Sequence, residues 1–118
     1  MMQTIKISLL KKESEINEET SKAEYIKLLT STIDCTKIKS AQLQEIPVLC
    51  QEIFDEMQTY ELQYVPTHVG VWIEYTNGNK IENAIELSVL NSIEKYGDQI
   101  KKPFAEFFNW TIENPKNN

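Results

Sequence analysis

The stretch QEIFDEMQTYELQY, residues 51–64, carries four carboxylates and two tyrosines and no positive charge. Its acidic residues and tyrosines are Glu52, Asp55, Glu56, Tyr60, Glu61 and Tyr64. Paired carboxylates can perform general acid–base catalysis, but only in a pocket that separates their pKa values. Tyrosine is enriched at the centres of protein interfaces, and nearby carboxylates attract lysine and arginine. We expect these carboxylates on the exposed side of a helix and outside any pocket. The stretch is therefore more typical of a protein-binding surface than of an active site.

A second acidic-aromatic patch is predicted on two strands later in the chain. Side chains alternate between the two faces of a strand, so the following residues fall on one face: Trp72, Glu74, Glu82 and Glu86. A purely structural role is the alternative for each aromatic residue. In that alternative Tyr60 and Tyr64 pack half-buried against the sheet, and a helix covers Trp72.

We expect no catalytic residue, no metal ion and no cofactor. His68 is the only histidine, and Cys35 and Cys50 are the only cysteines. These three residues are 15 and 18 positions apart, a wider spacing than structural zinc sites use. Glu52 and Glu56 are four positions apart, but the Glu-x-x-His motif of carboxylate-bridged metal sites is absent. The sequence also lacks a phosphate-binding loop and a nucleophile elbow.

The negative charge of the chain is concentrated in its middle. The net charge is −6. The chain has no arginine, which argues against a phosphate- or nucleic-acid-binding module, and biased codon usage in an AT-rich genome is the alternative explanation. Residues 40–94 carry nine acidic side chains and one base, Lys80, whereas each flank has a net charge of +1. Such a field repels nucleic acids and anionic membranes and attracts a basic protein. The alternative is a solvated acidic surface that only keeps the protein soluble.

The bulk properties predict one cytoplasmic domain. A chain of 118 residues suits one hydrophobic core, since two domains would each be too small to bury one. The start, MMQTIKISLLKK, lacks the apolar core of a signal peptide, and no run of about eighteen apolar residues could span a membrane. In the cytoplasm Cys35 and Cys50, which have apolar neighbours, are expected to be reduced and packed.

The first half of the chain predicts a strand and two helices. Residues 3–10 alternate like a half-buried strand, and residues 20–31 have helical spacing after a capping Thr20 or Ser21. Residues 32–46 are ambiguous between loop, strand and helix. A second helix is expected from Pro47 to about Glu61. Its predicted buried stripe is Leu49, Cys50, Ile53, Phe54 and Met57, and its predicted outer side is Gln51, Glu52, Asp55, Glu56 and Thr59.

The second half predicts a hairpin and two more helices. HVGVWIEY (68–75) and KIENAIEL (80–87) alternate like strands on either side of Asn77-Gly78, a strong hairpin-turn signal. A helix over residues 82–96 is the alternative to the second strand. We then expect a short helix that ends at Gly97 and a C-terminal helix that begins at Pro103. The predicted fold is α+β: a small, mainly antiparallel sheet, formed by the N-terminal strand and the 68–87 hairpin, with three to four helices packed on it.

This overall profile is similar to that of small bacterial immunity proteins in size, acidity, absence of catalytic groups and expected compartment. The resemblance implies a tight one-to-one complex that inhibits a basic toxin, for example a nuclease, by occlusion. Two non-enzymatic alternatives remain open: a structural or regulatory interaction subunit, and a phage-type antagonist that mimics DNA. An enzyme of unrecognised type would instead require a deep pocket with a perturbed titratable group.

Overall fold

The computed structural model describes residues 1–17, 22–91 and 102–114, and it has the expected α+β fold. The strands are β1 (Met2–Asn17), β2 (Lys22–Asp34), β3 (His68–Tyr75) and β4 (Lys80–Glu86). The α-helices of the described part are α1 (Ile46–Met57), α2 (Leu87–Asn91) and α3 (Pro103–Glu113). Two short 3-10 helices, Cys35–Lys37 and Ser40–Glu45, lead from β2 into α1.

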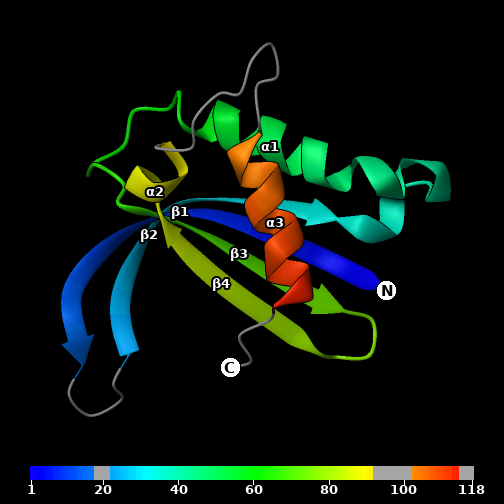
Figure 1. Cartoon of the computed structure of the whole chain (residues 1–118), viewed down its shortest axis with the longest axis horizontal. Coiled ribbons are helices and arrows are strands. Elements are labelled where there is room, and N and C mark those ends of the chain that lie inside the picture. The colour runs from blue at the N-terminus through cyan, green and yellow to red at the C-terminus, as the bar shows by residue number, and fades with distance from the viewer. Residues whose placement is uncertain (18–21, 92–101, 115–118) are drawn as a thin grey trace.

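The four strands form one antiparallel sheet in the order β2-β1-β3-β4. Helices α1 and α3 cross one face of this sheet (Figure 1). The core lies between them, where Ile7 and Val71 from the sheet are buried with Phe54, Phe104 and Phe108 from the helices. The rings of Phe54 and Phe104 stack with their centroids 4.6 Å apart. The apolar residues that alternate along β1 and β3 therefore lie on the sheet face that the helices cover, as the period-2 pattern predicts.

Strand β2 shows that our prediction of a helix over residues 20–31 was wrong. Leu29 lies opposite Leu9, and Thr30 lies opposite Ser8, with their hydroxyl oxygens 2.9 Å apart. The apolar residues of the segment do have helical spacing. However, the segment ends in TSTI, residues 30–33, which is rich in β-branched residues that favour an extended backbone. Pairing with β1, which runs well past the predicted end of the first strand, then decides the conformation. The proposed capping residues of that helix lie outside the described residues.

Helix α1 is rotated about its axis relative to the predicted stripe. Its buried residues are Ile46, Cys50, Gln51, Phe54 and Met57. Leu49, which we predicted to face inward, is exposed, and Gln51, which we predicted to face outward, is buried. The reason is the packing of α3 against α1. The Oε1 atom of Gln51 accepts hydrogen bonds from the N–H groups of Phe104, at 2.9 Å, and Ala105, at 3.0 Å. Gln51 therefore caps the first turn of α3, where Lys102 makes no side-chain capping bond.

The hairpin of β3 and β4 is confirmed, and β4 ends at Glu86, where α2 begins. Gly78 has a φ of 89°, and its N–H donates to the carbonyl of Tyr75. The side-chain amide of Asn83 donates to the carbonyl of Asn114 at the end of α3, so the helix is tied to the sheet edge. The predicted end of a helix at Gly97 lies outside the described residues. None of the described helices is long and apolar enough to cross a membrane.

Candidate protein-binding surface

The outer side of α1 presents three of the predicted carboxylates to solvent. Glu52, Asp55 and Glu56 are all exposed. Asp55 also accepts a hydrogen bond of 2.9 Å from the side-chain amide of Gln51, the residue that caps α3. This carboxylate therefore helps to orient the cap, whereas Glu52 and Glu56 lie one turn apart beside it on the surface.

Tyr60 continues this surface beyond the end of α1, which stops at Met57 rather than near Glu61 as we predicted. Its side chain is 54 % exposed, and its hydroxyl lies 3.3 Å from Oε1 of Glu56. Because the hydroxyl is the donor and the carboxylate the acceptor, this contact holds the ring beside the acidic side of the helix. Tyr60 is not packed against the sheet as a half-buried core residue would be.

The segment between α1 and β3 carries the remaining two residues of this predicted surface. Glu61 is exposed, and Tyr64 is 42 % exposed. The Nζ atom of Lys11 stands 4.2 Å from the ring centroid of Tyr64, a distance typical of a cation–π contact. One face of this tyrosine ring is therefore occupied by a lysine of the same chain.

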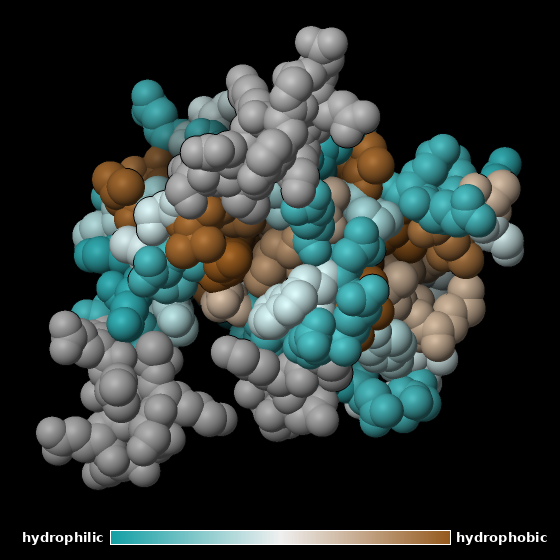
Figure 2. Space-filling model, in the orientation of Figure 1, coloured by the Kyte–Doolittle hydropathy of each residue, from teal (hydrophilic) through white to brown (hydrophobic). Residues whose placement is uncertain are grey.

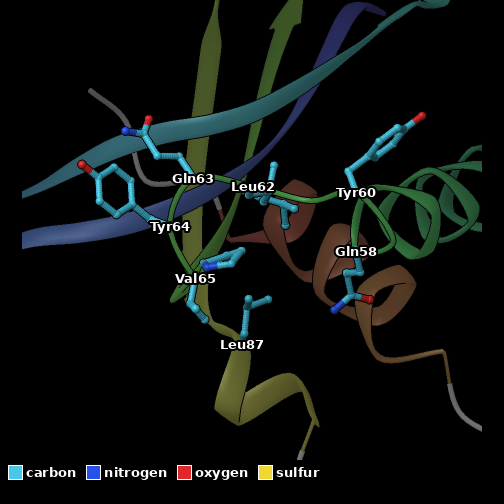
Figure 3. Close-up of a pocket in the computed structure, with 9 residues that line it drawn as sticks. Gln58, Tyr60, Leu62, Gln63, Tyr64, Val65 and Leu87 are labelled. Atoms are coloured by element: carbon cyan, nitrogen blue, oxygen red, sulfur yellow. The ribbon is translucent and has the colours of Figure 1, made fainter.

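The same segment encloses a hollow of about 380 Å³ that our sequence analysis missed. Its lining is Leu9, Gln58, Tyr60, Leu62, Gln63, Tyr64, Val65, Pro66 and Leu87. We call this hollow the Leu62 pocket. Leu62 and Leu87 line it, with Val65 at its exposed rim, and Tyr60 and Tyr64 stand at opposite sides with their rings directed outward (Figure 3). The apolar residues of ELQYVP, in a segment with proline and no strand or helix pattern, were the only sequence signal for it.

The strand residues of the second predicted patch lie on the opposite face of the sheet from α1 and α3. Trp72 is partly exposed there, next to a shallow hollow of about 230 Å³ that Glu82 also lines. The Nζ atoms of Lys6 and Lys80 lie 4.8 Å and 5.7 Å from the Trp72 ring. This patch therefore combines both signs of charge, and no described helix covers its tryptophan.

Glu86 lies apart from these residues, beside the single histidine. Its carboxylate is 4.0 Å from Nε2 of His68 and accepts a hydrogen bond from the Ser88 hydroxyl at 3.3 Å. The Nδ1 atom of His68 is 2.8 Å from the hydroxyl of Thr67, and its ring meets the edge of Tyr25 at 5.0 Å. Burial lowers the pKa of His68, while the charge of Glu86 opposes that shift.

The predicted site residues lie in two separate patches. Glu52, Asp55, Glu56, Tyr60, Glu61 and Tyr64 follow one another along α1 and the segment after it. Trp72, Glu74 and Glu82 occupy the other face of the sheet, and Glu86 is at its edge near His68. A single flat interface cannot cover both faces of a sheet. The patch on α1 is the more acidic of the two, since it has four carboxylates and contact with one lysine, Lys11, whereas the other has two carboxylates and contact with Lys6 and Lys80.

The two thiols are packed in the core. Cys35 and Cys50 are buried and unbridged, and burial raises the pKa of both, that of Cys50 to about 12. A thiol with a raised pKa forms little of the reactive thiolate at neutral pH. Among the described residues, no three histidine, cysteine, aspartate or glutamate side chains gather closely enough to hold a metal ion.

No family model matches the chain, and no curated protein or solved structure is significantly similar to it.

Proposed function

We propose that this protein is an acidic protein-binding inhibitor of the immunity type, which binds a basic partner one-to-one and blocks that partner's active surface. The observation that carries the proposal is the acidic surface of α1, formed by Glu52, Asp55 and Glu56, which leads directly into the exposed Tyr60 and Tyr64. We call these residues, together with Glu61, the α1 surface. Carboxylates next to exposed tyrosines provide both attraction at a distance and contact area on docking.

The charge distribution supports a basic partner. The α1 surface lies in a stretch of forty residues, 40–79, that contains no lysine, so no cation of this stretch offsets its carboxylates. Such a surface accelerates encounter with positively charged proteins and repels nucleic acid. The clefts of nuclease toxins are basic because they bind nucleic acid, and an acidic protein is the electrostatic complement of such a cleft. Inhibition by occlusion in the cytoplasm is therefore the role that we propose for it.

The test is affinity capture from a lysate of the source organism, carried out at about 50 mM and about 500 mM salt. We expect one basic protein to be retained in equal amounts at both salt concentrations. The activity of that purified partner should then fall to zero at a one-to-one molar ratio with this protein. Loss of all captured proteins at high salt, or a partner that keeps its activity in the complex, would contradict an inhibitory role.

A further inference from the structure

We infer that the Leu62 pocket receives one large apolar side chain of the basic partner, and that this side chain is flanked in the partner by lysine or arginine. The inference deepens the proposed function and rests on it for the existence of the partner. It assigns the centre of the contact to the pocket and leaves the carboxylates of α1 at its edge.

The shape and chemistry of the pocket favour an apolar occupant. Leu62, Val65 and Leu87 line it together with Leu9 of β1, which is buried. Its volume of about 380 Å³ falls in the range of small-ligand pockets, so a leucine, methionine or phenylalanine side chain has room to enter. The two glutamines of the lining, Gln58 and Gln63, provide amide groups for hydrogen bonds to the partner's backbone.

The surface around the pocket exposes apolar groups that a partner would cover. Val65 is 82 % exposed, the largest exposed fraction among the large apolar side chains of the described residues, and Val89 on α2 is also exposed. Figure 2 shows hydrophobic residues over α2 and the segment after α1, next to hydrophilic ones. An apolar centre inside a polar rim is the usual arrangement of residues that dominate the binding energy of an interface.

The pocket is formed by a backbone that is fixed before any partner binds. The N–H of Tyr60 donates to the carbonyl of Met57, and the N–H of Thr67 donates to the carbonyl of Leu10 on β1. The N–H of Leu87 donates in turn to the carbonyl of Thr67, which ties the start of α2 to the end of the segment. Pro66 restricts the backbone at the position between. A preformed site loses little conformational entropy on binding, so its contacts contribute more to affinity.

The charges near the pocket determine which kind of residue should flank the apolar side chain in the partner. Glu56 contacts Tyr60 at one side of the pocket, and Glu61 is next to it in the chain. On the other side Lys11 of this chain already lies over the ring of Tyr64, so we expect the partner's lysine or arginine on the side of Glu56 and Glu61. A second copy of this chain would bring together two molecules of net charge −6, so charge favours a basic partner over self-association.

The experiment uses three capped pentapeptides titrated into the full-length protein labelled at its leucine and valine methyl groups. The sequences are Lys-Lys-Phe-Lys-Lys, Lys-Lys-Ala-Lys-Lys and Glu-Glu-Phe-Glu-Glu. We expect the first peptide to shift the methyl resonances of Leu62, Val65 and Leu87 and to bind at least about tenfold more tightly than either of the others. The alanine peptide isolates the contribution of the apolar side chain, and the glutamate peptide isolates that of the flanking charge.

A matched pair of valine variants tests the location of the binding site. Val65→Ser removes an exposed apolar group from the pocket and should weaken binding of the Lys-Lys-Phe-Lys-Lys peptide several-fold. Val48→Ser makes the same change on α1, outside the pocket, at a side chain that is 38 % exposed, and should leave binding unchanged. Both sites are on the surface, so loss of folding does not complicate the comparison.

Three results would overturn the inference: equal binding of the alanine and phenylalanine peptides, equal binding of the acidic peptide, or methyl shifts that depend on protein concentration without peptide. The last would assign the pocket to a second copy of the chain. The peptide titration tests only the pocket, whereas capture and inhibition of a partner test the proposed function. A captured partner that is inhibited without contact at Leu62 would therefore overturn only the assignment of the pocket.

Discussion

Gln51 joins α1 to α3 through its side-chain amide. Its Oε1 atom accepts two backbone N–H groups of α3, and its amide nitrogen donates to Asp55. Gln51→Leu fills the same space but leaves both N–H groups buried without an acceptor. We expect the free energy of unfolding, measured in urea, to fall by about 1–3 kcal/mol. Gln44→Leu, at an exposed position, should change it by less than about 0.5 kcal/mol. Equal effects of the two variants would show that the cap contributes nothing.

His68 makes the stability of the protein dependent on pH. Burial lowers its pKa in the folded protein below the value near 6.5 that it has in an unfolded chain. The folded state therefore binds this proton less readily, and its stability is fully present above pH 6.5 and declines as the pH falls through the folded pKa. The charges of Glu86 and Lys12 act on the pKa of His68 in opposite directions, Glu86 raising it and Lys12 lowering it.

The check is urea unfolding of the wild type and of His68→Gln at pH 7.5 and about pH 5.5. We expect the wild type to lose more stability than the variant between these two values. The difference cannot exceed about 1.4 kcal/mol per pH unit, because one proton is involved. A variant with the same loss as the wild type would assign the acid sensitivity to other groups.

The hairpin of β3 and β4 depends on one glycine. Gly78 has a φ of 89°, and no atom lies within 4 Å of the position that a Cβ would take. Gly78→Ala should therefore destabilise the fold by about 1–2 kcal/mol through backbone strain alone. Gly78→Asn should cost less, since asparagine tolerates this conformation, and Thr76→Ala in the same loop serves as the control. Thermal unfolding measures the three variants, and an asparagine variant as unstable as the alanine variant would contradict the backbone explanation.

At the scale of elements, local sequence patterns predicted some of the structure. They failed where the conformation of a segment depends on contacts with residues far away in the sequence. The hairpin and the C-terminal helix followed from turn chemistry, alternation and the position of Pro103, all of which act over a few residues. Residues 22–34 carry a helical spacing as well as β-branched residues, and only pairing with β1 selected the strand. The rotation of α1 has a similar cause, because Gln51 is drawn inward by the backbone of α3 more than fifty positions away.

At the scale of the whole molecule, the two acidic patches can be separated by charge reversal. Glu52→Lys with Glu56→Lys changes the α1 surface, and Glu74→Lys with Glu82→Lys changes the opposite face of the sheet. Both double variants raise the net charge from −6 to −2. We expect the first double variant to weaken binding of the captured partner by several kcal/mol and the second to have little effect on it. Calorimetry at about 150 mM salt measures both binding free energies.

Circular dichroism should show that both double variants are folded, since all four positions are at least partly exposed. Equal weakening by the two variants would mean that only the total charge matters. Weakening by the second variant alone would move the interface to the face that carries Trp72.

The sequence by itself determined the α+β class, the hairpin, the buried apolar faces of β1 and β3, and the concentration of carboxylates in the middle of the chain. These features depend on composition and on periodicity over a few residues, which the order of residues shows directly. The tertiary structure alone decided that residues 22–34 are a strand, that Glu86 lies beside His68, and that Leu62, Val65 and Leu87 line one pocket. The physical reason is that each of these depends on contacts between residues distant in sequence, whose pairing no local pattern specifies.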